Sequence, residues 1–344
     1  MRGMKSVIAS ETEAPGRVAG LDLLRGLAAL AVVVFHLTWA AHRADPSVPP
    51  FKAGHLGVEV FFVISGYVIL MSAYRSHDRR AFALARLIRL YPTYLICMGL
   101  TTAWVFGLGV WRFEVSPSAW LLNLTMVPGW FHVRCLDGVY WTLGYEVGFY
   151  VVVAALLPAA KRGYALHLSA AFLLVLPLLS LGLRNASFFT MGIALYEFRR
   201  NRLFAVVVLS AAIVIGHHLD MTLVAPLLVA VAASVPAPRR FGAWAGAVSY
   251  PLYLLHDDIG WVLVLLYGGA LGGWGGLALG VSTIVLLAAS VQHFGERPIS
   301  AFLKSAVKRP AGVALGRFAA GDAARPGAAS APMRVNPGIG KVAG

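Results

Sequence analysis

Residues 21–36 read LDLLRGLAALAVVVFH, and this stretch decides the fold class. It begins an apolar run that extends to about residue 41, and about 20 such residues are enough to cross a lipid bilayer as a helix. We therefore predict an all-α fold, a polytopic membrane helix bundle of about ten transmembrane helices. The predicted spans are roughly 21–41, 56–73, 88–110, 138–158, 165–183, 186–198, 203–218, 221–236, 244–267 and 274–294.

The composition argues against a water-soluble protein. The chain of 344 residues is 59% hydrophobic and 13% charged, whereas a soluble domain carries about 25% charged residues. Because the apolar segments follow one another without a gap of domain size, we predict one transmembrane domain over residues 20–303. Residues 1–19 and 304–344 are predicted to be cytoplasmic tails, the second of them disordered. Charged residues and a proline before residue 18 argue against a cleaved signal peptide.

The net charge of +14 is distributed in short clusters between the apolar runs, such as Arg79–Arg80 and Arg239–Arg240. If the N-terminus is cytoplasmic and the spans alternate, 23 of the 29 Lys and Arg residues fall on the inner side. Cytoplasmic loops carry such an excess. We therefore predict an inner-membrane protein in contact with membrane lipid, with both termini in the cytoplasm. We predict no nucleic-acid partner, because no motif that reads DNA or RNA accompanies the charge.

Two polar side chains of the first span are the leading candidates for the active site, because polar groups inside a span are costly. Arg25 and His36 lie 11 positions apart. In a helix their side chains therefore point within about 20° of the same direction, about 16 Å apart along the axis. We predict that they act together in catalysis, with His36 as a general base near neutral pH. The alternatives are an arginine that snorkels to the interface and a histidine that only hydrogen-bonds another helix.

A carboxylate in the fourth span is the next candidate. Glu146 lies among apolar and aromatic residues, where it must be paired, protonated or in contact with water. We predict that it orients His36 or stays protonated as a hydrogen-bond donor, and the alternative is a structural pair with an arginine. Supporting roles are predicted for Glu59, at the start of the second span, and for Tyr140 and Trp141.

A basic segment precedes the third span and is predicted to be an interfacial helix that runs into it. Arg86 and Arg89 lie three residues apart in this segment, on one helix face. Paired guanidinium groups suit phosphate recognition, and the alternative is anchoring to lipid phosphates. We predict that both arginines, with Ser65, bind a phosphate-bearing substrate that donates a chemical group. Gly66 is expected to let two helices approach closely.

The last third of the chain holds a further polar group in the predicted span 244–267. His256, Asp257 and Asp258 could ligate a metal, but adjacent residues of a helix point in different directions. We therefore predict no metal, and give His256 a supporting role. The glycines between residues 268 and 273 predict a flexible or closely packed turn, and the Glu-Arg-Pro sequence at 296–298 predicts a local ion pair and a helix stop.

An outer loop is predicted over residues 111–137. It carries Trp111, Trp120, Trp130 and Phe131. Aromatic residues of this kind favour the membrane interface. The functional alternative is that the loop binds an acceptor on the outer face.

Together these residues form an ordered set of motifs that resembles the acyltransferase-3 family of integral membrane O-acyltransferases, over about residues 20 to 300. The first motif is the arginine, ten intervening residues and histidine of LDLLRGLAALAVVVFH. Glu59 departs from the pattern, because the family usually has aspartate there. The further matching blocks are GVEVFFVISGYVI at 57–69, RLIRLYP at 86–92, VYWTLGYEVGFY at 139–150, FFTMGIALY at 188–196, SYPLYLLH at 249–256 and GERP at 295–298.

The resemblance implies the reaction. It implies an enzyme that moves an acyl group, often acetyl, from cytoplasmic acyl-CoA to a hydroxyl of a carbohydrate or cell-envelope glycan. It makes Arg25 and His36 the essential pair and Arg86 and Arg89 donor-side cations, with acyl-CoA as a substrate and no bound cofactor. His36 is expected either to deprotonate the acceptor hydroxyl or to take the acyl group transiently. We expect a stand-alone membrane module without an appended esterase-like domain. The competing readings are a transporter or flippase for a lipid-linked sugar, and a purely structural subunit of a membrane complex.

Overall fold

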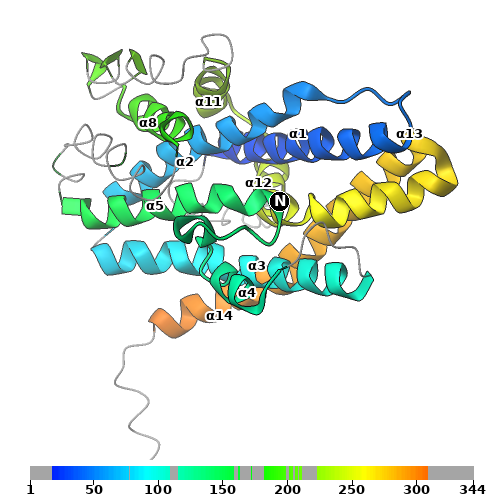
Figure 1. Ribbon diagram of the computed structural model, residues 1–344. Coiled ribbons are helices and arrows are strands. Elements are labelled where there is room, and N and C mark those ends of the chain that lie inside the picture. Colours follow the sequence, from blue (N-terminus) through cyan, green and yellow to red (C-terminus); the bar gives the residue numbers. More distant parts are fainter. Residues whose placement is uncertain are drawn as a thin grey trace, which may run out of the picture. The chain divides into compact units, whose positions relative to one another are not determined.

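Every regular element in the described part of the chain is a helix, which confirms the predicted all-α class (Figure 1). Residues 1–17 and 309–344 of the predicted tails, and most residues of the predicted spans 165–183 and 203–218, lie outside the described residues. The chain forms two compact units, residues 1–302 and 303–344. The helices that carry the candidate site belong to the first unit. This computed structural model describes residues 18–76, 78–108, 115–158, 162, 172, 182–198, 201–203, 206–207, 209–210 and 223–308.

Helix α1 (Ala19–Ala44) packs against several other helices of the bundle. Its sequence contains no proline, and an acidic residue in the first turn and basic residues in the last complement the helix dipole. It contacts α2 (Leu56–Arg75), α12 (Arg239–Leu255) and α13 (Asp258–Ser290). Since α1 is unbroken, the shared face predicted for its two polar residues is confirmed.

Helix α3 (Arg79–Leu108) unites the basic segment with the third predicted span, as the sequence predicted. The carboxylate of Asp78 begins it by accepting a hydrogen bond of 2.8 Å from the backbone N–H of Ala81. Pro92 lies within the helix and does not end it. The two arginines of this segment are therefore held on a rigid element. The loop that follows contains the short helix α4 (Pro117–Asn123).

A second group of helices also packs against α2. It consists of α5 (Trp141–Ala155), α8 (Leu183–Glu197) and α11 (Val224–Ser234). Gly66 of α2 meets α8 so closely that a Cβ atom there would lie 2.0 Å from the carbonyl oxygen of Phe189. The predicted role of Gly66 in helix packing is thereby confirmed.

The predicted span 244–267 is wrong as a single helix. Helix α12 ends at Leu255 and α13 begins at Asp258, so the polar residues between them form a junction of two helices. Within α13 the chain turns at Gly272, whose φ of 73° falls in the left-handed region that glycine tolerates. Beyond the turn, Gly276 packs against the backbone of Gly268. The predicted glycine turn is therefore confirmed as a closely packed one.

The predicted helix stop at residues 296–298 is also wrong. A π-helical stretch (Val291–Glu296) follows α13, and α14 (Arg297–Lys308) continues directly from it. The backbone N–H of Arg297 donates to the carbonyl oxygen of Gln292, so the helical run is continuous across this boundary. Pro298, the second residue of α14, does not end it.

Four helical segments of the described residues are long and apolar enough to cross a membrane. They cover residues 19–44, 52–75, 79–104 and 258–307. Many apolar side chains lie exposed on the helices, among them Leu227 and Leu286, which are 64% and 68% exposed. Such a surface suits contact with lipid. The count of about ten spans and the cytoplasmic position of the termini stay predictions.

Candidate functional site

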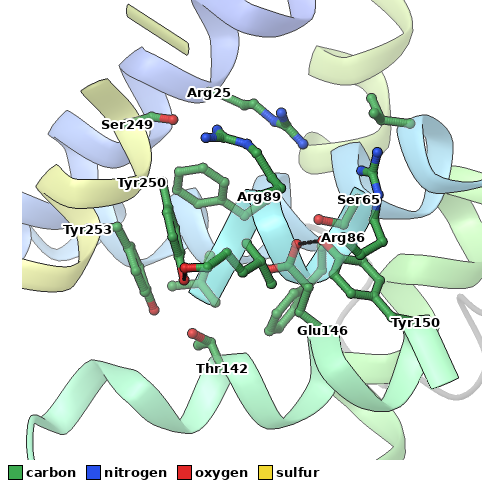
Figure 2. A pocket seen from close by; sticks show the side chains of 15 residues that line it. Arg25, Ser65, Arg86, Arg89, Thr142, Glu146, Tyr150, Ser249, Tyr250 and Tyr253 are labelled. Atoms are coloured by element: carbon green, nitrogen blue, oxygen red, sulfur yellow. Dashed lines mark hydrogen bonds between the residues drawn. The ribbon is translucent and has the colours of Figure 1, made fainter. Parts of the chain in front are cut away.

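Five of the residues singled out from the sequence line one pocket. Figure 2 shows Arg25, Ser65, Arg86, Arg89 and Glu146 pointing into this space. They come from four helices, α1, α2, α3 and α5, and α12 closes the pocket with further polar and aromatic side chains. The additional labelled lining residues are Thr142, Tyr150, Ser249, Tyr250 and Tyr253.

Three guanidinium groups face this pocket, and one carboxylate accompanies them. Arg25 and Arg89 lie across from each other, and Arg86 stands on the neighbouring turn of α3 beside Ser65 (Figure 2). Guanidinium groups keep their charge at every physiological pH. The pocket therefore carries a positive excess, which suits an anionic group such as a phosphate.

Arg86 is largely uncommitted to other protein groups. One of its terminal nitrogens donates to the hydroxyl of Ser72 over 3.3 Å, and its guanidinium carbon lies 5.9 Å from the ring centre of Phe82. Its Nε is buried and, within the described residues, has no hydrogen-bond partner. The guanidinium of Arg86 is therefore held by few protein groups of the described chain, and the residue lines the pocket.

Arg89, in contrast, already holds a carboxylate. It forms an ion pair with Glu296, 207 residues further along the chain, and its guanidinium lies 5.9 Å from the ring centre of Tyr250. Glu296 was predicted to pair with its neighbour Arg297. The structure corrects this, because the π-helical stretch directs Glu296 to α3. Arg89 therefore ties the end of the bundle to the wall of the pocket.

Glu146 has a different partner from the one predicted. Its carboxylate accepts a hydrogen bond from the hydroxyl of Tyr150, one turn further along α5 (Figure 2). The imidazole of His36 instead meets that of His256, whose Nε2 lies 3.0 Å from Nδ1 of His36. The structure thus places the carboxylate among the arginines, and gives the orienting contact to the histidine at the end of α12.

The histidine pair lies beyond one wall of the pocket. The ring of His256 is 5.6 Å from that of Tyr253, which lines the pocket, and Tyr253 lies 5.6 Å from the ring of Phe61, another lining residue. Arg25 reaches the pocket from the same helix that carries His36. Helix geometry separates these two residues by about 16 Å along α1.

The remaining predicted residues lie outside the arginine pocket. Glu59 is buried on α2, with 7% of its surface exposed. Tyr140 and Trp141 line a second pocket on another face of α5, together with Trp130 and Tyr145. Tyr140 is almost fully buried, whereas Trp141 is 42% exposed. The loop at 111–137, for which acceptor binding is the functional alternative to an interface position, therefore contributes to a cavity with aromatic walls.

Three carboxylates gather where the loop before α5 meets the junction of α12 and α13. Asp137 is fully buried and accepts hydrogen bonds from the backbone N–H groups of Val139 and Asp258, at 3.1 and 3.4 Å. Burial, reinforced by Asp257 and Asp258, raises the pKa of Asp137 well above its ordinary value. The protonated form of this carboxyl is therefore favoured in the folded protein.

Sequence reasoning missed Tyr150 and Tyr253 as members of the site. Both could have been found from helix periodicity, since Tyr150 is four residues after Glu146 and Tyr253 three before His256. The ion pair of Arg89 with Glu296 could not have been found in this way, because the two residues are 207 positions apart in the sequence.

Comparison with known proteins supports the reading of these motifs. A family model for an acyltransferase domain, that of the acyltransferase-3 family, matches residues 18–291. The membrane-bound transacylase BcsY of Komagataeibacter xylinus is 31% identical over 184 residues, covering 49% of this chain and 45% of the relative. Nodulation protein 10 of Rhizobium leguminosarum bv. viciae is 29% identical over 175 residues, covering 44% of this chain and 48% of the relative.

A third relative is the O-acetyltransferase OatA of Staphylococcus aureus, which is 27% identical over 197 residues, or 52% of this chain and 31% of the relative. The matches therefore span about half or less of the length of each of these relatives. No solved structure matches the chain.

Proposed function

The chain belongs to the acyltransferase-3 family, and from this we propose that it is a membrane O-acyltransferase that moves an acetyl or similar acyl group from cytoplasmic acyl-CoA to a hydroxyl of a carbohydrate or cell-envelope glycan. One observation carries the proposal most directly. Three arginines from α1 and α3 converge on a pocket whose wall adjoins a histidine that can act as a base. This is the arrangement that a donor with phosphates at one end and a thioester at the other requires.

The donor's phosphates bind to Arg25, Arg86 and Arg89 in this proposal. Arg86 is the arginine of this pocket that offers its terminal nitrogens most readily, because it makes one hydrogen bond of 3.3 Å, whereas Arg89 already pairs with Glu296. Guanidinium groups bind phosphate through two parallel hydrogen bonds. Ser65, beside Arg86 in the same pocket, supplies a hydroxyl to the donor. Glu146 limits the positive charge and keeps Tyr150 in place.

The reaction follows from the imidazole of His36. Nε2 of the His36 ring takes the proton from the acceptor hydroxyl while the hydroxyl oxygen bonds to the thioester carbon. The bond between carbon and sulfur then breaks, and the CoA thiolate leaves and recovers the proton from the imidazolium. The product is an ester on the acceptor, and His36 returns to its starting state. The distance of about 16 Å along α1 between Arg25 and His36 is spanned by the donor's extended arm.

The acceptor is a glycan hydroxyl that approaches through the second pocket. Trp130, Tyr140, Trp141 and Tyr145 line it, and flat aromatic faces pack well against the apolar faces of sugar rings. The name of one relative, an O-acetyltransferase, supports a hydroxyl as the acceptor group. With the N-terminus in the cytoplasm, the arginine pocket opens to the donor side and the aromatic loop faces outward. We accordingly propose an inner-membrane location with both termini in the cytoplasm.

Reconstitution into lipid vesicles tests the proposal. Acetyl-CoA labelled on its acetyl group is supplied together with cell-envelope glycan fractions, and the label on the glycan is measured. We expect transfer by the natural chain and none by His36→Gln, at equal protein level and correct insertion. A fully active His36→Gln variant refutes the role of His36. Movement of a lipid-linked sugar without consumption of acetyl-CoA establishes the flippase reading instead.

A further inference from the structure

A pair of histidines joins the middle of α1 to the end of α12. His256 is completely buried, and its Nδ1 lies 2.7 Å from the carbonyl oxygen of Tyr253. Its other nitrogen, Nε2, lies 3.0 Å from Nδ1 of His36. Nδ1 of His36 in turn lies 3.1 Å from the carbonyl oxygen of Val32. Three close contacts thus involve only three ring nitrogens, and this determines where the protons are.

The assignment begins at the carbonyl of Tyr253. This group belongs to the last turn of α12, whose carbonyls have no partner within the helix. A carbonyl oxygen can only accept, so Nδ1 of His256 must carry a proton and donate it. In a neutral imidazole the other nitrogen then carries a lone pair. Nε2 of His256 is therefore an acceptor.

The acceptor on His256 fixes the state of His36. Nδ1 of His36 must hold the proton, because it faces the lone pair of His256 on one side and the carbonyl of Val32 on the other. In the opposite tautomer of His36, the lone pair on Nδ1 would face the lone pair on Nε2 of His256 and those of the carbonyl oxygen of Val32. A second proton on His256 would instead place a cation in a fully buried position, where charge is expensive. One proton, at Nδ1 of each ring, satisfies these three contacts.

We propose that His256 is a positioning residue that holds His36 in the tautomer with Nδ1 protonated, so that the lone pair of this imidazole is on Nε2, the nitrogen that acts as the base in the proposed function. The inference rests on the proposed function, in which His36 is the base. It adds a partner for that base which is a neutral imidazole instead of a carboxylate. The ring of His256 is itself fixed by the carbonyl of Tyr253, a residue that lines the arginine pocket.

Nuclear magnetic resonance of the full chain in lipid nanodiscs tests the tautomer directly. The protein is labelled with ¹⁵N at its ten histidines, and two-bond ¹H–¹⁵N spectra near neutral pH distinguish the protonated from the unprotonated ring nitrogen. The signals of His36 and His256 are identified by their loss in His36→Gln and His256→Gln. We expect a protonated Nδ1 and an unprotonated Nε2 for both rings. A protonated Nε2 on His36, or two protonated nitrogens on His256, overturns the proposal.

Substitution of His256 tests the dependence of one ring on the other. In His256→Phe the ring shape is kept and the acceptor is lost, so His36 should shift to a mixture of tautomers and kcat should fall by roughly 10- to 100-fold, with KM for the donor little changed. His256→Gln keeps an amide oxygen that can accept from Nδ1 of His36, so it should restore part of kcat. The exposed His293, replaced in His293→Phe, provides the control with unchanged kcat.

The outcomes separate this proposal from the proposed function. An unchanged His36 spectrum in folded His256→Phe refutes the positioning role, whatever the activity. If the chain transfers no acyl group, the tautomer of His36 in the natural chain still confirms or overturns the proton assignment. Equal loss of kcat in His256→Phe and His256→Gln, with identical His36 spectra, reduces His256 to a packing residue and refutes the inference.

Discussion

Arg86 and Arg89 lie one turn apart on α3 and line the same pocket, yet their replacement should have opposite main effects. Arg86 makes one hydrogen bond of 3.3 Å, to Ser72, and its buried Nε has no partner within the described residues. Arg89 neutralises the buried carboxylate of Glu296. We therefore expect Arg86→Ala to weaken donor binding with little loss of stability, and Arg89→Ala to reduce stability.

The magnitudes follow from these contacts. A hydrogen bond to a charged group contributes about 1.5–3 kcal/mol, so loss of the phosphate contact of Arg86 should raise Kd for the donor roughly 10- to 100-fold. The ion pair of Arg89 lies between an exposed and a buried one, because its partners' side chains are 34% and 10% exposed. Exposed pairs contribute up to about 1 kcal/mol, and breaking a buried one costs about 3–5 kcal/mol. We expect Arg89→Ala to lower the free energy of unfolding by about 2 kcal/mol.

The assay measures both quantities on the same detergent-solubilised protein. Kd is determined by calorimetry with a non-hydrolysable acetyl-CoA analogue, and stability by thermal unfolding. The double variant Arg89→Ala with Glu296→Gln should recover most of the lost stability, because the carboxylate no longer lacks a partner. Unchanged Kd in Arg86→Ala refutes the phosphate assignment. Equal stability of Arg89→Ala and the natural chain refutes the structural role of the ion pair.

Two further predictions concern packing and pH. Gly66→Ala should lower the free energy of unfolding by at least about 2 kcal/mol, because the new Cβ would lie 2.0 Å from the carbonyl oxygen of Phe189; Gly99→Ala, where nothing lies within 4 Å, is the matched control and should not destabilise the protein. The raised pKa of Asp137 favours the protonated form in the folded state, so its contribution to stability is present below the unfolded pKa of about 3.9 and is lost as pH rises through the folded value. Asp137→Asn should therefore flatten the fall of the melting temperature above pH 4, and an identical slope in both proteins would contradict the assignment.

Features of a single helix were predictable from the sequence. The shared face of Arg25 and His36 depends only on the helical repeat, and α1 is indeed unbroken. The arrangement of Arg86 and Arg89 on one face of α3 has the same origin. The close approach at Gly66 followed from the absence of a side chain. Each of these predictions required no knowledge of which helices are neighbours.

Features that depend on two distant segments were not predictable in the same way. Glu296 is next to Arg297 in the sequence but pairs with Arg89, because a π-helical stretch rotates the end of the chain relative to a regular helix. The break after Leu255 was missed because the segment on both sides is continuously apolar. Hydropathy detects lipid-compatible residues and is insensitive to a change of helix direction among them.

The break after Leu255 also explains why the histidine pair exists. Had one straight helix continued through residues 244–267, the carbonyl of Tyr253 would accept from the backbone N–H of Asp257 and would not be available to His256. Because α12 ends there, that carbonyl has no partner within the helix and can hold the imidazole, which then presents Nε2 to His36. The wrongly predicted element and the wrongly predicted partner of His36 thus have one cause. The helix end that hydropathy could not detect is the feature that orients the proposed base.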